Sequence, residues 1–441
     1  FWATGGVHAP HQAPREWIEQ FKGKFDMGYD TAREMILANQ IKMGIVPKGT
    51  KLSPRDPEIP AWNTLNDQEK ALYARQMEAF AGQLAYSDYE FGRILDYLER
   101  IGELDNTLVI FTSDNGASGE GGLHGTFNEN GFFNGVPNIP YEVNSQYINE
   151  WGNRVGVWHV TAGWTQAGNT PFQYYKQSSH RGGNADPLVI SWPKGIDKKY
   201  HGQIRTQYSH IIDIAPTILE AAGVKAPKII DGVEQMPFDG IAMNYSFNDP
   251  KTKDRRTVQY YELFGNRGIY ADGWTAVTLH KQRRPWVLNK EGSIDTDVWE
   301  LYNLKDDFSQ STNLADKHPE KLKELQALFE KDPQGSAEEQ NRDPQNHSRN
   351  HQRRDHQKIE CLFEAKLLLL EQKRPAGPHG CGQKSHEKSH LNADPDAVQI
   401  DPVLKDAYPL RQIGEKPVQG KAFPGQGGKL GVVEGQDAGH E

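Results

Sequence analysis

Two short, mostly apolar runs constrain the fold of this chain more than any other feature. Residues 107–112 (TLVIFT) and 187–192 (PLVISW) are rich in β-branched side chains, which is typical of strands buried on both faces. Apolar residues recur at three- and four-residue steps over 66–100, and 214–223 has the same helical character. Strands that alternate with helices predict an α/β fold with a mainly parallel sheet, sandwiched between helices.

The character of the sequence changes twice toward its C-terminal end. Over 257–304, alternating aromatic segments punctuated by turn residues predict antiparallel hairpins, and 319–329 predicts a helix. After residue 331 polar residues, Gly and Pro dominate, a composition that buries too little apolar surface to offset chain ordering. We therefore predict a main α/β domain over 1–250, a smaller antiparallel α+β subdomain over 251–330, and a low-complexity, disordered tail over 331–441.

Composition argues against several classes of partner. The 59 acidic residues outnumber the 50 basic residues, and the net charge of −9 argues against nucleic acid. The chain has no run of about 18 apolar residues that would predict a membrane span. Its two cysteines are Cys361 and Cys381, so the main body has neither a disulfide framework nor a cysteine nucleophile.

The first residues predict a break inside a folded domain. Residue 1 is Phe rather than Met, and Phe1–Thr4 resembles the end of a buried strand with no leader sequence before it. We therefore expect the parallel sheet to be incomplete at its N-terminal side, with an unpaired strand edge.

Asp114 and Asn115 are candidate metal ligands. They follow directly after the strand predicted over 107–112, and ligands of open α/β sheets gather at the carboxyl ends of strands. Their side-chain oxygens suit a hard divalent cation such as Ca²⁺. The alternative is a simple turn, because Asn-Gly is also among the commonest turn signals.

Two histidines and a lysine are further candidates. Pro10 disfavours a helix around His8 and His11, so these two do not form a zinc-binding pair on one helix face. Either histidine could act as a general acid or orient an anion, or could be a structural loop residue. Lys176 is a point charge suited to a sulfate or phosphate oxygen, although a solvated lysine in a surface loop would have the same sequence.

Taken in order, these segments resemble the type I sulfatases, the formylglycine-dependent branch of the alkaline phosphatase superfamily. They are most similar to the large bacterial arylsulfatases. The resemblance extends from Phe1 to about Phe329. It rests on five segments in the family's order: 7–14, 104–117, 175–183, 212–219 and 262–268.

The resemblance implies that a formylglycine hydrate, activated by one Ca²⁺ ion, cleaves a sulfate monoester. Asp114 and Asn115 match two ligands of that ion. Lys176 matches the lysine that contacts a sulfate oxygen, and His11 matches the histidine that assists the leaving group, whereas His8 matches no family role. The implied partners are a small-molecule or carbohydrate sulfate ester and the machinery that generates formylglycine.

The sequence departs from the family in its nucleophile. The modification signature, a Cys or Ser followed at fixed spacing by Pro and Arg, is absent. So is the aspartate pair that completes the metal site, and we expect both to precede residue 1. This predicts an inactive fragment of a sulfuric ester hydrolase. The alternatives are a phosphodiesterase or phosphonate monoester hydrolase of the same superfamily, or a non-catalytic binding module.

Overall fold

The computed structural model describes residues 2–331 of the chain, except residues 137, 283 and 288–291. The chain divides into two compact units, residues 1–360 and 361–441, and every described residue belongs to the first. The predicted tail past residue 331 and both cysteines lie outside the described residues. In the described part, no helix has both the length and the apolar character that a bilayer span requires.

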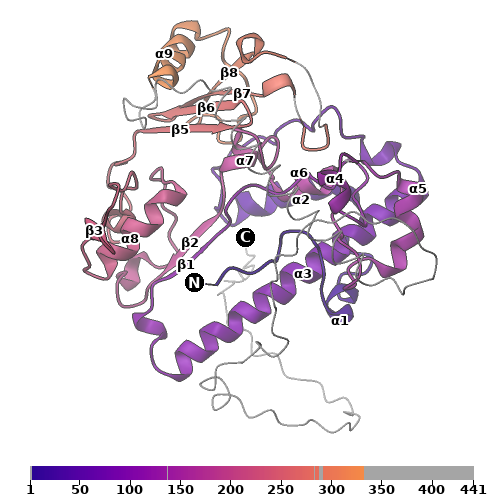
Figure 1. Ribbon diagram of the computed structural model, residues 1–441, viewed down its shortest axis with the longest axis horizontal. Helices are drawn as coiled ribbons and strands as arrows, with labels where there is room; N and C mark the ends of the chain where they lie inside the picture. The colour runs from indigo at the N-terminus through magenta and orange to yellow at the C-terminus, as the bar shows by residue number, and fades with distance from the viewer. Residues whose placement is uncertain (1, 137, 283, 288–291, 332–441) are drawn as a thin grey trace, which may run out of the picture. The chain divides into compact units, whose positions relative to one another are not determined.

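The longest element is α3 (Asp67–Arg100), which crosses the main part of the molecule (Figure 1). It begins with a capping box: Glu69 N donates to the Asn66 side chain, and Asn66 N donates to the Glu69 carboxylate. These bonds satisfy two donors at the helix start. Gly102 follows the helix with a φ of +76°, a conformation that glycine adopts without strain. The helix predicted over 66–100 is therefore confirmed.

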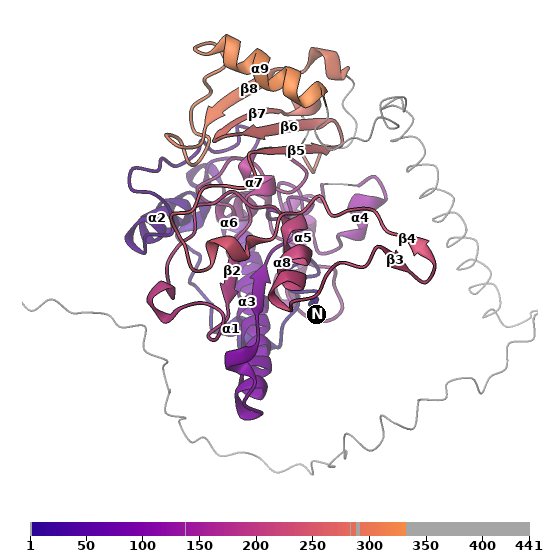
Figure 2. The same cartoon turned by 90° about the vertical axis from the view of Figure 1, so that its left-hand side faces the viewer.

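Short helices connect and cover the remaining elements (Figure 2). The other α-helices of the described part are α1 (Arg15–Glu19), α2 (Gly28–Lys42), α4 (Asn130–Phe133), α5 (Tyr141–Asn144), α6 (Ala162–Gly168), α7 (Arg181–Asn184), α8 (Ile214–Ala221) and α9 (Pro319–Glu330). Short 3₁₀ segments are η1 (Trp62–Thr64), η2 (Leu104–Asn106), η3 (Ser145–Glu150), η4 (Lys198–Tyr200), η5 (Ile211–Asp213), η6 (Met243–Ser246), η7 (His280–Gln282) and η8 (Ile294–Thr296). Helix α8 confirms the helix predicted over 214–223.

The main core lies where α2, α6 and the first half of α3 meet. It is rich in tryptophan, and α1 packs against α3 beside it. Aromatic rings in this core meet mostly edge to face, as Tyr29 does with both Trp62 and Trp164, a favourable geometry for buried rings. Residues 116–171, which have little regular periodicity, contribute Trp151, Trp158 and Trp164 to it.

Strands β1 (Val109–Thr112) and β2 (Leu188–Ser191) form a two-stranded sheet. They confirm the two predicted strands, but they pair antiparallel, with Val109 opposite Ser191 and Thr112 opposite Leu188. In the part of the chain that the structure describes, all named strands pair antiparallel. The predicted parallel pairing is wrong for β1 and β2, because an apolar run reports burial on both faces and carries no information on strand direction.

A second sheet, farther along the chain, has its own small core. Its antiparallel strands follow one another in the order β5 (Val258–Leu263), β6 (Asn266–Ala271), β7 (Trp274–Thr278) and β8 (Trp299–Asn303). Helix α9 packs on this sheet through Leu325 and Phe329 (Figure 2). The antiparallel hairpins predicted over 257–304 and the helix predicted over 319–329 are confirmed. A small hairpin, whose strands β3 (Ile229–Ile230) and β4 (Val233–Glu234) have two residues each, precedes this sheet.

The strand end predicted over Phe1–Thr4 does not form in its described residues, 2–4. Residues 2–5 have no regular secondary structure, and Trp2 stacks on Phe91 of α3 with a ring-centroid distance of 5.6 Å. An apolar segment forms a strand only when a partner satisfies its backbone groups. Trp2 instead covers part of the apolar side of α3 while remaining 43% exposed.

Candidate active site

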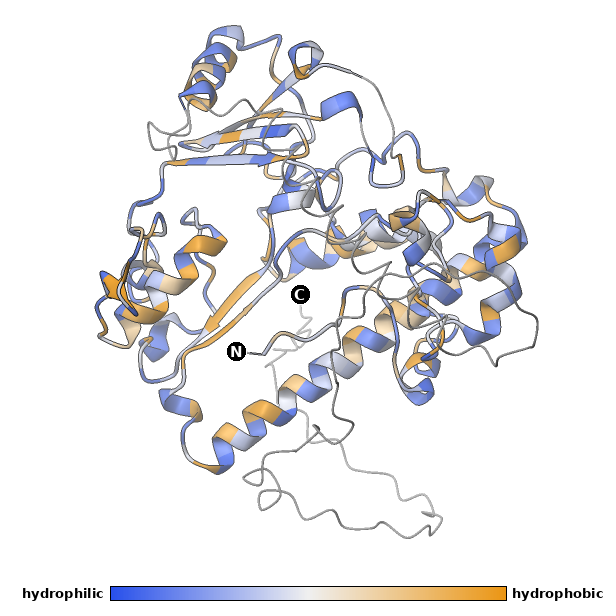
Figure 3. Ribbon diagram, viewed as in Figure 1, coloured by the Kyte–Doolittle hydropathy of each residue, from blue (hydrophilic) through white to orange (hydrophobic). Residues whose placement is uncertain are grey.

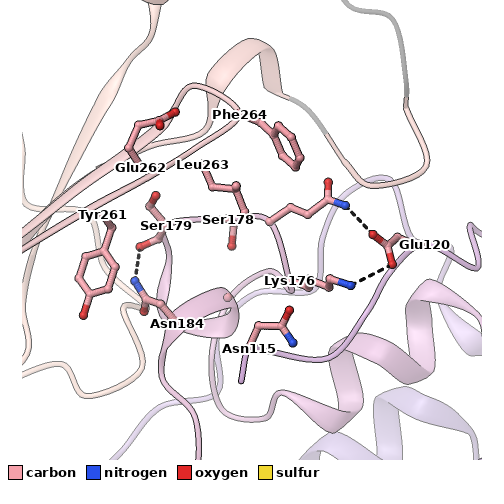
Figure 4. Close-up of a pocket in the computed structure, with 12 residues that line it drawn as sticks. Asn115, Glu120, Lys176, Ser178, Ser179, Asn184, Tyr261, Glu262, Leu263 and Phe264 are labelled. Carbon is pink, nitrogen blue, oxygen red and sulfur yellow. Dashed lines mark hydrogen bonds and ion pairs between the residues drawn. The ribbon is translucent and has the colours of Figure 1, made fainter. Parts of the chain in front are cut away.

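A pocket of about 380 Å³ brings together three segments that are far apart in the sequence (Figure 4). One wall is the loop after β1, with Asn115 and Glu120. A second is the loop that contains Lys176 and Gln177, and the third is the end of β5 together with its turn. Two of the residues predicted from the sequence, Asn115 and Lys176, therefore line the same cavity.

Asp114 and Asn115 lie together at the end of β1. The Asn115 side-chain amide donates to the Asp114 carboxylate at 3.0 Å. Asp114 is exposed. Burial, reinforced by the negative charge of Asp114, raises the pKa of Asp186 to about 6. The carboxylates near this strand end therefore create a negative potential, and the amide and carboxylate oxygens are hard donors. These residues fit two positions in a Ca²⁺ shell.

Two glycines hold the Asp114–Asn115 loop in place. Gly116 N donates to Gly183 O at 3.2 Å. A Cβ on Gly116 would lie 1.7 Å from the carbonyl oxygen of Gly182, which is far inside van der Waals contact. The loop that carries the candidate metal ligands can approach the Lys176 loop this closely because neither backbone has a side chain here.

We expect Gly116→Ala to destabilise the fold by about 1–3 kcal/mol, because the added methyl group forces two backbones apart. Thermal unfolding of the purified chain measures this. Gly92→Ala in α3 is the matched control, since a Cβ there meets no atom within 4 Å. It should raise stability by about 0.5–1 kcal/mol, the usual gain for alanine inside a helix. Equal melting temperatures for Gly116→Ala and wild type would contradict the close approach.

Lys176 forms the polar centre of the cavity. Its ammonium nitrogen lies 3.2 Å from a Glu120 carboxylate oxygen and 3.2 Å from Nε2 of His8. Figure 4 shows its side chain reaching across the cavity toward Glu120. Lys176 N donates to Ala117 O at 3.0 Å, which ties the loop to the segment after β1. The lysine side chain is 23% exposed, so its charge remains accessible from the pocket.

Glu120 is a buried carboxylate that holds Lys176 and its neighbour. It is 5% exposed and accepts hydrogen bonds from Ser118 Oγ at 2.9 Å and from Gln177 Nε2 at 2.7 Å. Burial by itself would raise the pKa of Glu120, but the charge of Lys176 and these hydrogen bonds lower it below its ordinary value. Glu120 is therefore ionised at neutral pH and positions the ammonium group.

His11 does not line the pocket. It is 2% exposed, and its ring centroid lies 5.0 Å from the rings of both His159 and Phe80. Burial, followed by the neighbouring His159, lowers the pKa of His11 well below its ordinary value, so the ring is neutral at pH 7. Its Nδ1 is buried without a hydrogen-bond partner. The structure thus brings His8, rather than His11, into contact with Lys176.

Sequence reasoning missed Glu120, Gln177 and the position of His8. Glu120 is a single carboxylate in a glycine-rich loop, and no spacing rule marks it. The only sequence signal for Glu120 is that it lies in the same long loop after β1 as Asp114. His8 meets Lys176 across 168 residues of sequence, a contact that local patterns cannot reveal.

Two protein-family models match this chain. A sulfatase family model matches residues 1–224, and a model for the C-terminal region of N-sulphoglucosamine sulphohydrolase matches residues 173–335. The chain belongs to the sulfatase family. The resemblance noted from the sequence motifs is confirmed, and with it the predicted fold class, α/β with an antiparallel C-terminal sheet.

Several relatives carry sulfatase names. An uncharacterized sulfatase of Schizosaccharomyces pombe is 32% identical over 322 residues, covering 72% of this chain and 54% of that protein. An arylsulfatase of Klebsiella aerogenes is 28% identical over 250 residues, covering 56% and 51%. The chain thus spans about half the length of the curated relatives it matches.

More distant matches come from the same superfamily and from solved structures. A multifunctional alkaline phosphatase superfamily protein of Trinickia caryophylli is 28% identical over 199 residues, covering 45% of this sulfatase chain and 27% of that protein. Among solved structures, one in complex with its substrate D-glucosamine-2-N,6-O-disulfate is 23% identical, with a TM-score of 0.36 and coverage of 59% of this chain and 40% of that one.

Proposed function

We propose that this chain is the part of a sulfuric ester hydrolase that binds a sulfate monoester, small-molecule or carbohydrate, and supplies part of a Ca²⁺ site. The observation that carries the proposal is the shared pocket: Asn115 and Lys176 line one cavity, and Asp114 is hydrogen-bonded to Asn115. A cation and an ammonium group on one cavity concentrate positive charge where the oxygens of a sulfate group would lie.

Each residue of this chain has a role in the proposal. Asp114 and Asn115 would hold the metal ion, which when bound would polarise the sulfate group. Lys176, positioned by Glu120, binds a sulfate oxygen. The role of His11 in assisting the leaving group rests on the sequence resemblance alone, because its ring is buried outside the pocket. His8 can orient Lys176 through the contact at 3.2 Å.

The nucleophile in this proposal is a formylglycine carried by sequence outside this chain. The modification signature of Cys or Ser, Pro and Arg is absent from all 441 residues. The exposed apolar strands support this interpretation: Phe111 of β1 and Val189 of β2 are 47% and 58% exposed, although both strands are strongly hydrophobic (Figure 3). In a complete α/β sheet, helices packed on both faces would cover such side chains.

The proposal is tested with the full-length protein that contains this sequence, produced together with formylglycine-generating machinery. We expect hydrolysis of 4-nitrophenyl sulfate that is lost after removal of Ca²⁺ by a chelator and restored when the ion is added back. The 441-residue chain alone should show no turnover. Calcium-dependent turnover by the chain alone would contradict the proposed division of the site.

The same assay separates the alternative reactions. A phosphodiester and a phosphonate monoester offered to the full-length protein should be turned over more slowly than the sulfate ester. Faster turnover of either would replace the sulfatase proposal with the phosphodiesterase or phosphonate monoester hydrolase alternative. Absence of turnover for all three esters, with calcium bound and formylglycine present, would favour a non-catalytic binding module.

A further inference from the structure

Lys176 contacts a cluster of potential metal ligands that differs in chemistry from the Asp114–Asn115 pair. It consists of His8, Glu120 and Glu129, which come from the N-terminal segment, the loop after β1 and the residue before α4. One ligand atom from each residue lies within 4.8 Å of the other two. We propose that these three side chains bind a divalent transition-metal ion such as Zn²⁺.

Glu129 provides independent support for a ligand at this place. It is 5% exposed, and its Oε1 is buried without a hydrogen-bond partner. The neighbouring basic group is His159, whose Nε2 lies 3.9 Å away. That nitrogen lies closer to Ser118 Oγ, at 3.0 Å, and makes its hydrogen bond there. A buried carboxylate oxygen without a partner is costly, and a cation held between Glu129, Glu120 and His8 would satisfy it.

The donor set selects the kind of ion. Imidazole and carboxylate together suit Zn²⁺ and its transition-metal neighbours, whereas Ca²⁺ takes oxygen donors alone. Three protein ligands leave a fourth position for water, as in open zinc sites. Both carboxylates are buried and His8 is exposed, so an ion would enter from the His8 side.

Lys176 competes for the same place. Its ammonium nitrogen is 3.2 Å from Nε2 of His8 and 3.2 Å from Glu120, two of the three proposed ligands. The charges of two carboxylates balance one divalent ion, so the bound ion would repel the ammonium group of Lys176. Binding of the ion therefore displaces Lys176 from Glu120. This competition concerns binding alone and holds whether or not the chain takes part in sulfate hydrolysis.

The test is a Zn²⁺ titration of the full 441-residue chain against a competing chelator, followed by calorimetry. Seven histidines after residue 340 can bind further ions, so the site is identified by the difference between variants. His8→Ala should weaken the tightest binding at least about tenfold. The matched control is His201→Ala, an exposed loop histidine whose Nε2 contacts only a backbone oxygen in the described structure, and it should bind as wild type does.

Two further variants make the result specific. Glu129→Gln preserves shape and should also weaken binding at least about tenfold, and Lys176→Met should tighten it by removing the competing charge. Cobalt(II) in place of zinc gives a visible spectrum that reports coordination, and His8→Ala should change that spectrum. Wild-type affinity in His8→Ala, or weaker binding in Lys176→Met, would overturn the proposal. Because His8 is exposed, its variant remains decisive even if Glu129→Gln fails to fold.

Discussion

Replacing Asp114 with alanine in the full-length sulfatase is expected to lower kcat/KM for 4-nitrophenyl sulfate by more than about 10³-fold. The change removes one anionic ligand of the proposed Ca²⁺ ion and leaves Asn115 without its hydrogen-bonded neighbour. Without a tightly held ion, the charge that develops on the sulfate oxygens loses its main stabilisation. Steady-state kinetics and the calcium content of the purified variant measure the two effects together.

The control for Asp114→Ala is Asp105→Ala, an exposed aspartate in the turn before β1. It should have wild-type kinetics and calcium content, because it precedes β1, at the opposite end of that strand from Asp114 and Asn115. If Asp114→Ala kept both the ion and the activity, the assignment of the metal site to the end of β1 would be wrong. Loss of activity with full calcium content would instead indicate a role other than ligation.

Local sequence signals predicted elements whose structure depends on nearby residues. The helix α3 was predicted from apolar residues that recur at three- and four-residue steps, and the structure adds a capping box at its start. The C-terminal hairpins follow from aromatic segments separated by turns, and β5 to β8 form as expected. The helix ends and the turns between β5, β6 and β7 depend on residues that are close in the sequence, where pattern and propensity agree.

The same local signals do not determine the direction in which strands pair. The sequence of β1 and β2 indicates two-sided burial, and the strands pair antiparallel with both faces partly exposed. Pairing direction depends on which backbone groups are available to each edge, a property of the whole sheet. Residues 2–5 form no strand for a related reason, since no strand of the described part pairs with them to satisfy their backbone groups.

The candidate site was predictable where a motif carried it. Asp114, Asn115 and Lys176 were identified from their segments, and the pocket contains the last two. Glu120 and Glu129 were not identified, because a carboxylate becomes a ligand or an ion-pair partner only through burial and distant contacts. Glu120 meets Gln177 across 57 residues and Lys176 across 56. Such long-range pairs cannot be read from one sequence without an alignment.

Lys176→Met is expected to lower kcat/KM of the full-length sulfatase about 10²–10³-fold, comparable to the loss of one oxyanion-hole donor. The ammonium group is the cation that this chain presents to the pocket beside Asn115. Methionine keeps much of the side-chain volume, so the effect should come from the lost charge. Kinetics at saturating calcium separate this effect from any change in the metal site.

A second variant distinguishes lost catalysis from lost folding. Lys176→Met leaves Glu120 buried without its counter-charge, which should lower the melting temperature. Adding Glu120→Gln removes that charge as well, so the double variant should recover stability but not activity. Because the folded pKa of Glu120 is lowered, the ion pair stabilises the fold above the unfolded pKa, and this contribution disappears as pH falls through the folded pKa. The stability difference between Lys176→Met and wild type should therefore vanish in acid. A difference that persists in acid would show that Lys176 acts through packing rather than charge. Activity restored by the double variant would show the same.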